Sequence, residues 1–77
     1  MTLADVPVGD SVRVTALADD VPPRLLEMGV LPGTTVEVVR FAPLGDPMDV
    51  RVRGFHLSLR RSEAASVLVE ALGEDAT

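Results

Sequence analysis

The chain holds few of the side chains that carry out chemistry, because its 77 residues include one histidine, no cysteine and no tyrosine. A general base needs an orienting partner, and no nucleophile motif surrounds any of the serines. The histidine, His56, lies in the sequence FHLSL, where it alternates with Phe55 and Leu57 and is expected to sit half-exposed on a strand. The residues therefore predict neither an enzyme nor a bound cofactor.

Metal ligation is the second chemistry that the residue types allow, because twelve Asp and Glu side chains accompany the single histidine. Carboxylates suit hard divalent cations, but neither a His-x-x-His nor a Glu-x-x-His spacing is present. Asp46 and Asp49 flank a turn, and Asp19 and Asp20 begin a helical segment, so turn and cap are their ordinary roles. We expect no specific metal site.

Arginines form the densest chemical cluster in the chain. The span 50–61 contains Arg51, Arg53, Arg60 and Arg61 and no acidic residue, although the whole chain has a net charge of −5. That overall charge argues against nucleic-acid binding, which depends on basic residues that neutralise phosphates. We expect a hairpin to bring the first pair of arginines within reach of the second. The cluster is then either a solvated face balanced by carboxylates or a docking site for an acidic protein surface.

Apolar residues near a predicted turn and on a predicted helix are the other candidates for partner contact. The sequence FAPLGDPM places Phe41, Leu44 and Met48 around a hairpin turn, where apolar side chains are hard to bury. These residues either cap one end of the core or form an exposed contact patch. In PPRLLEMG, Leu25 and Leu26 cannot point the same way, so Leu26 joins the candidate contacts.

The segment MGVLPG links a predicted helix to a predicted strand. No phosphate-loop motif surrounds it, and its glycines follow a helix C-terminus, where the dipole disfavours an anion. Gly29 is placed to end the helix in a left-handed conformation, and Pro32 and Gly33 fit a type II turn. The segment therefore predicts a corner without chemistry of its own.

Hydrophobic periodicity predicts the elements that position these candidates. Alternating patterns indicate strands within 11–17, 34–43, 48–53, 55–60 and 67–72. The alternation in the second of these is imperfect, which means that both faces are partly covered or that a bulge shifts the register. A short helix is expected within 18–29, capped by Asp19 or Asp20 with prolines in its first turn. A helical turn is expected within 61–66, with Ser62 as its cap.

Five short strands in one small domain bury their faces well only when the sheet closes on itself. We therefore expect a mostly β fold, a small SH3-like barrel of about five strands. One short α-helix is inserted after the first strand, and a helical turn precedes the last strand. The chain is expected to form a single domain over residues 1–77, with its core at about 3–72.

The ordered motifs resemble the FeoA family of bacterial ferrous iron uptake, from Leu3 to about Leu72. The resemblance is carried by VGDSVRV, RLLEMGVLPGTTVEVV and APLGDPMDVRVRGFHLSLRRSEAASVLV, in this order. It implies an SH3-like fold and a non-enzymatic accessory role, exercised by docking on the cytosolic region of the ferrous iron transporter FeoB. The alternative is a regulatory or interaction module related to the C-terminal domain of iron-dependent repressors. Because the chain has no helix-turn-helix pattern, a free-standing repressor is not expected.

The sequence also bears on where the chain works. It contains no apolar run of about 18 residues that would span a membrane. Its first residues lack the basic and apolar regions of a signal peptide. We expect a cytoplasmic protein that does not itself span the membrane, that the transporter recruits to the membrane's inner face, and that self-associates weakly through exposed apolar residues.

Overall fold

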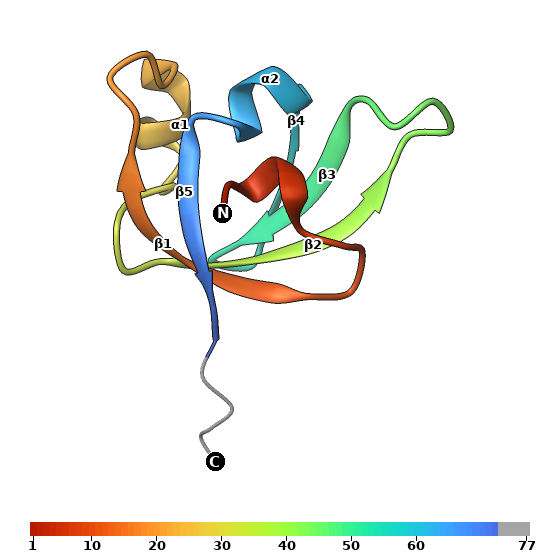
Figure 1. Ribbon diagram of the computed structural model, residues 1–77, viewed down its shortest axis with the longest axis horizontal. Helices are drawn as coiled ribbons and strands as arrows, with labels where there is room; N and C mark the ends of the chain where they lie inside the picture. Colours follow the sequence, from red (N-terminus) through yellow and green to blue (C-terminus); the bar gives the residue numbers. More distant parts are fainter. Residues whose placement is uncertain (73–77) are drawn as a thin grey trace.

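The computed structural model describes residues 1–72 and consists of one five-stranded antiparallel sheet with short helical segments around it (Figure 1). The elements in chain order are η1 (Leu3–Asp5), β1 (Ser11–Leu17), α1 (Pro23–Glu27), β2 (Thr35–Phe41), β3 (Met48–Val52), β4 (Phe55–Leu59), α2 (Arg61–Ala64) and β5 (Val67–Ala71). Across the sheet the strand order is β4-β3-β2-β1-β5. The predicted mostly β fold, with a helix after the first strand and a helical turn before the last, is confirmed.

The core is built from one face of the sheet, because successive side chains on a strand point to opposite faces. The buried strand residues are Val12, Val14, Val36, Val38, Met48, Val50, Val52, Leu57, Leu59, Val67 and Val69. Leu3 and Val6 from the N-terminal segment, Leu25 from α1 and Val30 after it complete this aliphatic core. Both phenylalanines lie outside the fully buried set.

Two β-bulges interrupt the ladders of the sheet. One lies between Val38 and Arg40 in the β2–β3 ladder, which explains the imperfect alternation and confirms the second of the two predicted readings. The other lies between Val14 and Ala16 in the β1–β5 ladder. Because a bulge bends its strand and increases the local twist, the two together help this short sheet to curl around its core.

The β3–β4 hairpin closes through a two-residue turn, Arg53-Gly54, between the paired residues Val52 and Phe55. Both turn residues have positive φ, 55° for Arg53 and 84° for Gly54, as a type I′ hairpin turn requires. Strand β3 therefore ends at Val52. Arg53 lies in the turn, and not on the outward face of a strand as expected.

The corner between α1 and β2 follows the prediction closely. Gly29 ends the helix with φ of +97°, and Gly33 has φ of +93°. The Thr34 backbone N–H donates to the Leu31 carbonyl at 3.0 Å, which closes the four-residue turn around Pro32. The segment is a corner that joins helix to strand.

Both predicted helix caps are wrong. Pro22 occupies the N-cap position of α1 and makes no side-chain cap bond, whereas Asp19 and Asp20 lie in the preceding turn. At α2 the cap residue is Arg60, and Ser62 lies inside the helix. The free N–H of Arg61 donates instead to Asp46 Oδ1 at 3.0 Å. A carboxylate from the β2–β3 hairpin thus supplies the bond that a local cap would make.

The two outer strands of the sheet are treated differently by the rest of the chain. Thr2 forms a β-bridge with Leu68 of β5, and the Val69 N–H donates to the Met1 carbonyl at 2.9 Å, so the N-terminal segment lies beside β5 (Figure 1). Within residues 1–72, β4 has no ladder or bridge other than the one to β3. Among these same residues no helix is long and apolar enough to cross a membrane.

Candidate interaction surfaces

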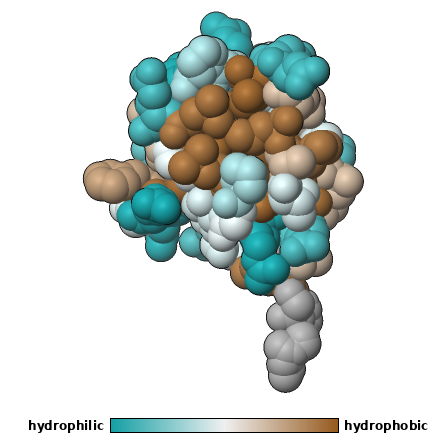
Figure 2. All heavy atoms as spheres, turned by 90° about the vertical axis from the view of Figure 1, so that its left-hand side faces the viewer, coloured by the Kyte–Doolittle hydropathy of each residue, from teal (hydrophilic) through white to brown (hydrophobic). Residues whose placement is uncertain are grey.

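The side of the molecule that carries α1 has a broad hydrophobic area (Figure 2). In α1 and the segment that follows it, Leu26, Met28 and Leu31 are 36%, 46% and 40% exposed, whereas the neighbouring Leu25 is fully buried. A helix of five residues cannot turn two adjacent leucines toward one core, so one of them must face outward. We call Leu26, Met28 and Leu31 the α1 apolar surface. Leu26 therefore remains a candidate for partner contact.

The β2–β3 hairpin splits its three predicted contact residues between core and solvent. Leu44 at the tip is 97% exposed. Phe41 is partly buried, and the Arg61 guanidinium lies 5.2 Å from the centroid of its ring. Met48 is fully buried, so the interpretation of Met48 as a contact residue is corrected: its side chain faces inward from β3 and packs in the core. Only Leu44 is freely available from this hairpin.

The four clustered arginines do not form one patch. Arg53 lies in the turn at one end of the β3–β4 hairpin, and Arg60 follows the Met48–Leu59 pair at the other end. Five paired positions separate the two ends, which amounts to roughly 15 Å at the rise of a strand. The expectation that the hairpin would bring the two pairs together is therefore wrong for Arg53 and Arg60, which lie beyond opposite ends of β4, whereas Arg51 lies within β3 opposite His56.

Each arginine has its own surroundings. Arg51 approaches Glu37 across the β2–β3 ladder, with 3.7 Å between Nη1 and Oε1. Arg53 extends past Gly29, where an added Cβ would lie 3.2 Å from the arginine Cδ. Arg61 donates from Nη2 to the Ala4 carbonyl at 3.1 Å. Within residues 1–72 the guanidinium of Arg60 has no ion-pair partner.

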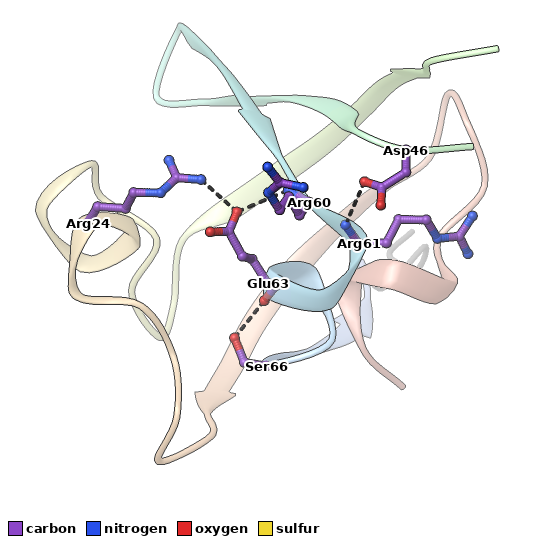
Figure 3. Close-up of polar contacts among 6 residues, drawn as sticks. All are labelled: Arg24, Asp46, Arg60, Arg61, Glu63 and Ser66. Carbon is purple, nitrogen blue, oxygen red and sulfur yellow. Dashed lines mark hydrogen bonds and ion pairs between the residues drawn. The ribbon is translucent and has the colours of Figure 1, made fainter. Parts of the chain in front are cut away.

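A polar network joins α1 to α2 and to the residues on either side of α2 (Figure 3). Glu63 Oε1 accepts from Arg24 Nη2 at 2.6 Å and from the Arg60 backbone N–H at 3.0 Å. The Ser66 hydroxyl donates to the Glu63 carbonyl at 2.6 Å. The carboxylate of Glu63 thus connects α2 to α1 through Arg24, a residue 39 positions earlier in the chain. The sequence analysis missed this network, since only a long-range fold brings its members together.

Two carboxyl groups titrate below their usual range. The hydrogen bond from the Arg60 backbone N–H lowers the pKa of Glu63, with a further contribution from Arg24. On the outer face of the sheet, the hydrogen bond from Arg40 lowers the pKa of Asp49. Both groups are thus held as anions by arginine neighbours, a pattern that ordinary structural ion pairs also produce.

The remaining chemistry-bearing residues stay apart. His56 is exposed on β4 opposite Arg51, and no carboxylate orients it through a hydrogen bond within the described residues. Over residues 1–72, no group of three or more His, Cys, Asp or Glu side chains is arranged to hold a metal ion.

Comparison with known proteins identifies the family. The model of the FeoA domain matches residues 1–71. FeoA from Chlorobium tepidum is 40% identical with a TM-score of 0.88, over 97% of this chain and 73% of that one. FeoA from Stenotrophomonas maltophilia, solved in complex with zinc and described as a prokaryotic SH3 domain protein, is 34% identical with a TM-score of 0.80. That match covers 91% of this chain and 89% of the other.

A third relative is a fusion of Fe(2+) transport protein A with the Fe(2+) transporter FeoB from Porphyromonas gingivalis. It is 46% identical over 54 residues, which is 70% of this chain but only 6% of the fusion protein. The resemblance read from the sequence and the SH3-like fold that it implied are both confirmed. The chain belongs to the FeoA family of small, non-enzymatic SH3-like domains of ferrous iron transport.

Proposed function

We propose that this protein is an accessory of the ferrous iron transporter FeoB and acts by docking on the transporter's cytosolic region. The fusion protein carries the argument, because it joins a homologous FeoA segment and FeoB in a single chain. Covalent linkage keeps two modules at a high effective concentration, which is useful when they work in contact. A separate FeoA chain would then need an interface of its own to reach the same partner.

Two exposed apolar features support a docking role. The α1 apolar surface offers three exposed apolar side chains within six residues of sequence, and Leu44 is exposed at the tip of the β2–β3 hairpin. Large exposed apolar areas on a small domain typically mark binding sites. The arginines add charge at the rim of the domain, where charge affects association rate and salt dependence more than final affinity.

The test is binding of this chain to the immobilised cytosolic region of FeoB. Leu26→Asp should weaken binding strongly if the α1 apolar surface docks, and Leu44→Asp should do so if the hairpin tip docks. Val8→Asp is the matched control, because Val8 is 52% exposed in the loop between η1 and β1, away from both features. The melting temperature of each variant separates lost contact from lost stability.

Charge reversal tests the arginines separately. Arg51→Glu together with Arg53→Glu should reduce capture in a salt-dependent manner if these residues steer the encounter. If wild-type protein binds no part of the transporter at any salt concentration, the docking proposal is wrong. Affinity capture from iron-limited cells that recovers a metal-dependent repressor and no transporter would favour the regulatory-module alternative.

A further inference from the structure

The outer edge of β4 carries unpaired main-chain groups. The two-residue turn makes Val52–Phe55 a hydrogen-bonded pair, and alternation along an antiparallel ladder does the same for Val50–Leu57. The same alternation makes Met48–Leu59 a hydrogen-bonded pair, so His56 and Ser58, which alternate with these positions, direct their N–H and C=O groups away from β3. Within residues 1–72, the N–H and C=O groups of His56 and Ser58 make no backbone hydrogen bond to a segment outside the strand. This edge is ready to pair with another strand.

The sequence of β4 lacks the devices that usually protect an edge strand. It contains no lysine, glutamate or proline, and its ladder with β3 runs through five pairs without a register shift. By contrast, the ladders of β1 with β5 and of β2 with β3 both contain bulges. Natural edge strands are commonly blunted by charge, proline or a bulge. The regular β4 edge is therefore a candidate for β-strand addition.

A groove lies against the C-terminal half of this edge. It has a volume of about 350 Å³, and its lining residues are Arg24, Asp46, Pro47, Ser58, Leu59 and Arg60. Strand β4 forms one side, and Arg24 reaches across from α1 to pair with Glu63 (Figure 3). Asp46 is engaged with the Arg61 N–H. Among the residues that line the groove, Arg60 has the guanidinium that makes no ion pair within residues 1–72, although its charge also helps to lower the pKa of Glu63.

We propose that this groove binds an extended segment of a partner protein, which adds to the sheet beside β4 and places a carboxylate side chain on Arg60. Main-chain hydrogen bonds to His56 and Ser58 supply the affinity that is independent of sequence, as in other cases of β-strand addition. The carboxylate supplies the preference for an acidic segment, because a guanidinium pairs with it through charge-assisted hydrogen bonds.

The charges at the groove favour an acidic peptide over a second copy of this domain. Arg60 makes no ion pair within residues 1–72 and calls for an acidic ligand, whereas the β4 segment of a second copy offers no carboxylate. The inference concerns the edge of β4, and it does not depend on which protein supplies the segment.

Three synthetic peptides test the proposal by amide NMR titration of the ¹⁵N-labelled chain. The first is an acetylated octapeptide of alternating Thr and Glu, the second replaces Glu by Lys, and the third is the first with the backbone nitrogens methylated on both edges. The first peptide should shift the amide signals of His56, Ser58 and Arg60 at millimolar concentration. The Lys peptide should bind more weakly, and the N-methylated peptide should leave these signals unchanged, because neither of its edges can donate backbone hydrogen bonds to β4.

Arg60→Gln is the matched protein variant, because the Arg60 side chain is exposed and makes no ion pair among the described residues, so its loss should leave the fold intact. It should weaken binding of the Glu peptide by about two- to fivefold, the effect of one exposed ion pair, without weakening binding of the Lys peptide. Absence of shifts at His56 and Ser58 with the Glu peptide would overturn the proposal. So would shifts from the N-methylated peptide equal to those from the Glu peptide, or concentration-dependent dimer formation through these amides without any peptide.

Discussion

The two outer strands of the sheet, β4 and β5, have the same length but opposite exposure. The edge of β5 is covered by Met1 and Thr2, which bond to Val69 and bridge to Leu68. The edge of β4 has no such cover within residues 1–72, although both strands alternate buried and exposed side chains. Protection therefore comes from a distant segment of the chain and not from the strand's own sequence. An edge left open in the same small sheet is available for a partner.

Proline substitution should reveal the open edge of β4 through the largest difference in stability. Arg51 and His56 lie opposite each other on β3 and β4, both with exposed side chains. The Arg51 N–H points into the β2–β3 ladder, whereas the His56 N–H points to the open edge. Arg51→Pro should cost about 3 kcal/mol or more, since it removes a ladder bond in an inner strand. His56→Pro should cost much less, and urea unfolding of the two variants measures the difference.

Arg51→Gln serves as the control for the loss of the arginine side chain, whose 3.7 Å approach to Glu37 is exposed. It should change the free energy of unfolding by less than about 0.5 kcal/mol. Equal destabilisation by the two prolines would mean that the β4 edge is not open in solution.

Removing the anchor of the N-terminal segment tests the covered edge. Leu3 is fully buried and holds the segment that lies over β5. Leu3→Ala should lower the free energy of unfolding by about 2–3 kcal/mol, because it leaves a cavity in the core. It should also speed hydrogen exchange of the Val69 amide, which bonds to Met1, by loosening the cover.

Leu44→Ala is the matched control for Leu3→Ala, since the Leu44 side chain is almost fully exposed and its loss leaves no cavity. Its effect on stability should stay within about 0.5 kcal/mol. If Leu3→Ala destabilises the protein but leaves Val69 exchange unchanged, the N-terminal segment is held over β5 by something other than Leu3.

The strands and the corner were predictable because their signals are local. Alternation of valines located β1, β3 and β5, and Gly29 and Gly33 marked backbone positions that need positive φ. The cap of α2 was only partly local: Glu63 accepts from the Arg60 N–H three positions earlier, but the Arg61 N–H bonds to Asp46 in another hairpin. The same limit explains why η1 was missed: its role is to carry Leu3 into a core formed by distant strands.

The candidate contacts show a similar division. Leu26 and Leu44 were found because adjacent leucines on a short helix, or a leucine at a turn tip, cannot all be buried. The arginine patch failed because spacing along the chain does not reveal that Arg53 and Arg60 lie at opposite ends of β4. The open β4 edge needed the strand order, which a single strand's sequence does not contain.

Acid sensitivity on the β4 side should depend on Glu63, which ties α1 to α2 beside the groove. The pKa of Glu63 is lowered from 4.5 by the Arg60 N–H and by Arg24. The stabilising effect of the Glu63 carboxylate is therefore complete above pH 4.5 and is lost as the pH falls through the lowered pKa of the folded state. Glu63→Gln should reduce the dependence of stability on pH between about pH 5 and pH 3, as urea unfolding at each pH would show.

Asp49→Asn provides the comparison for Glu63→Gln, since the pKa of Asp49 is also lowered but through Arg40 on the exposed face of the sheet. Both variants should reduce the loss of folding stability at acid pH. Only Glu63→Gln should increase amide hydrogen exchange in α1 and α2, the helices that the Glu63 carboxylate connects. Unchanged exchange in both helices would show that the network does not hold the groove together.

The smallest expected effect concerns the ion pair on the covered side of the sheet. Arg13 of β1 pairs with Glu70 of β5 at 3.0 Å, but both side chains are about half exposed. An exposed pair of this kind contributes less than about 1 kcal/mol, so Arg13→Gln should hardly change the urea midpoint or the exchange of the Val69 amide. A large increase in Val69 exchange would mean that the ion pair, and not the Met1–Thr2 segment, protects β5. The contrast between the two edges would then rest on side-chain charge, and adding an acidic residue near β4 should close the open edge.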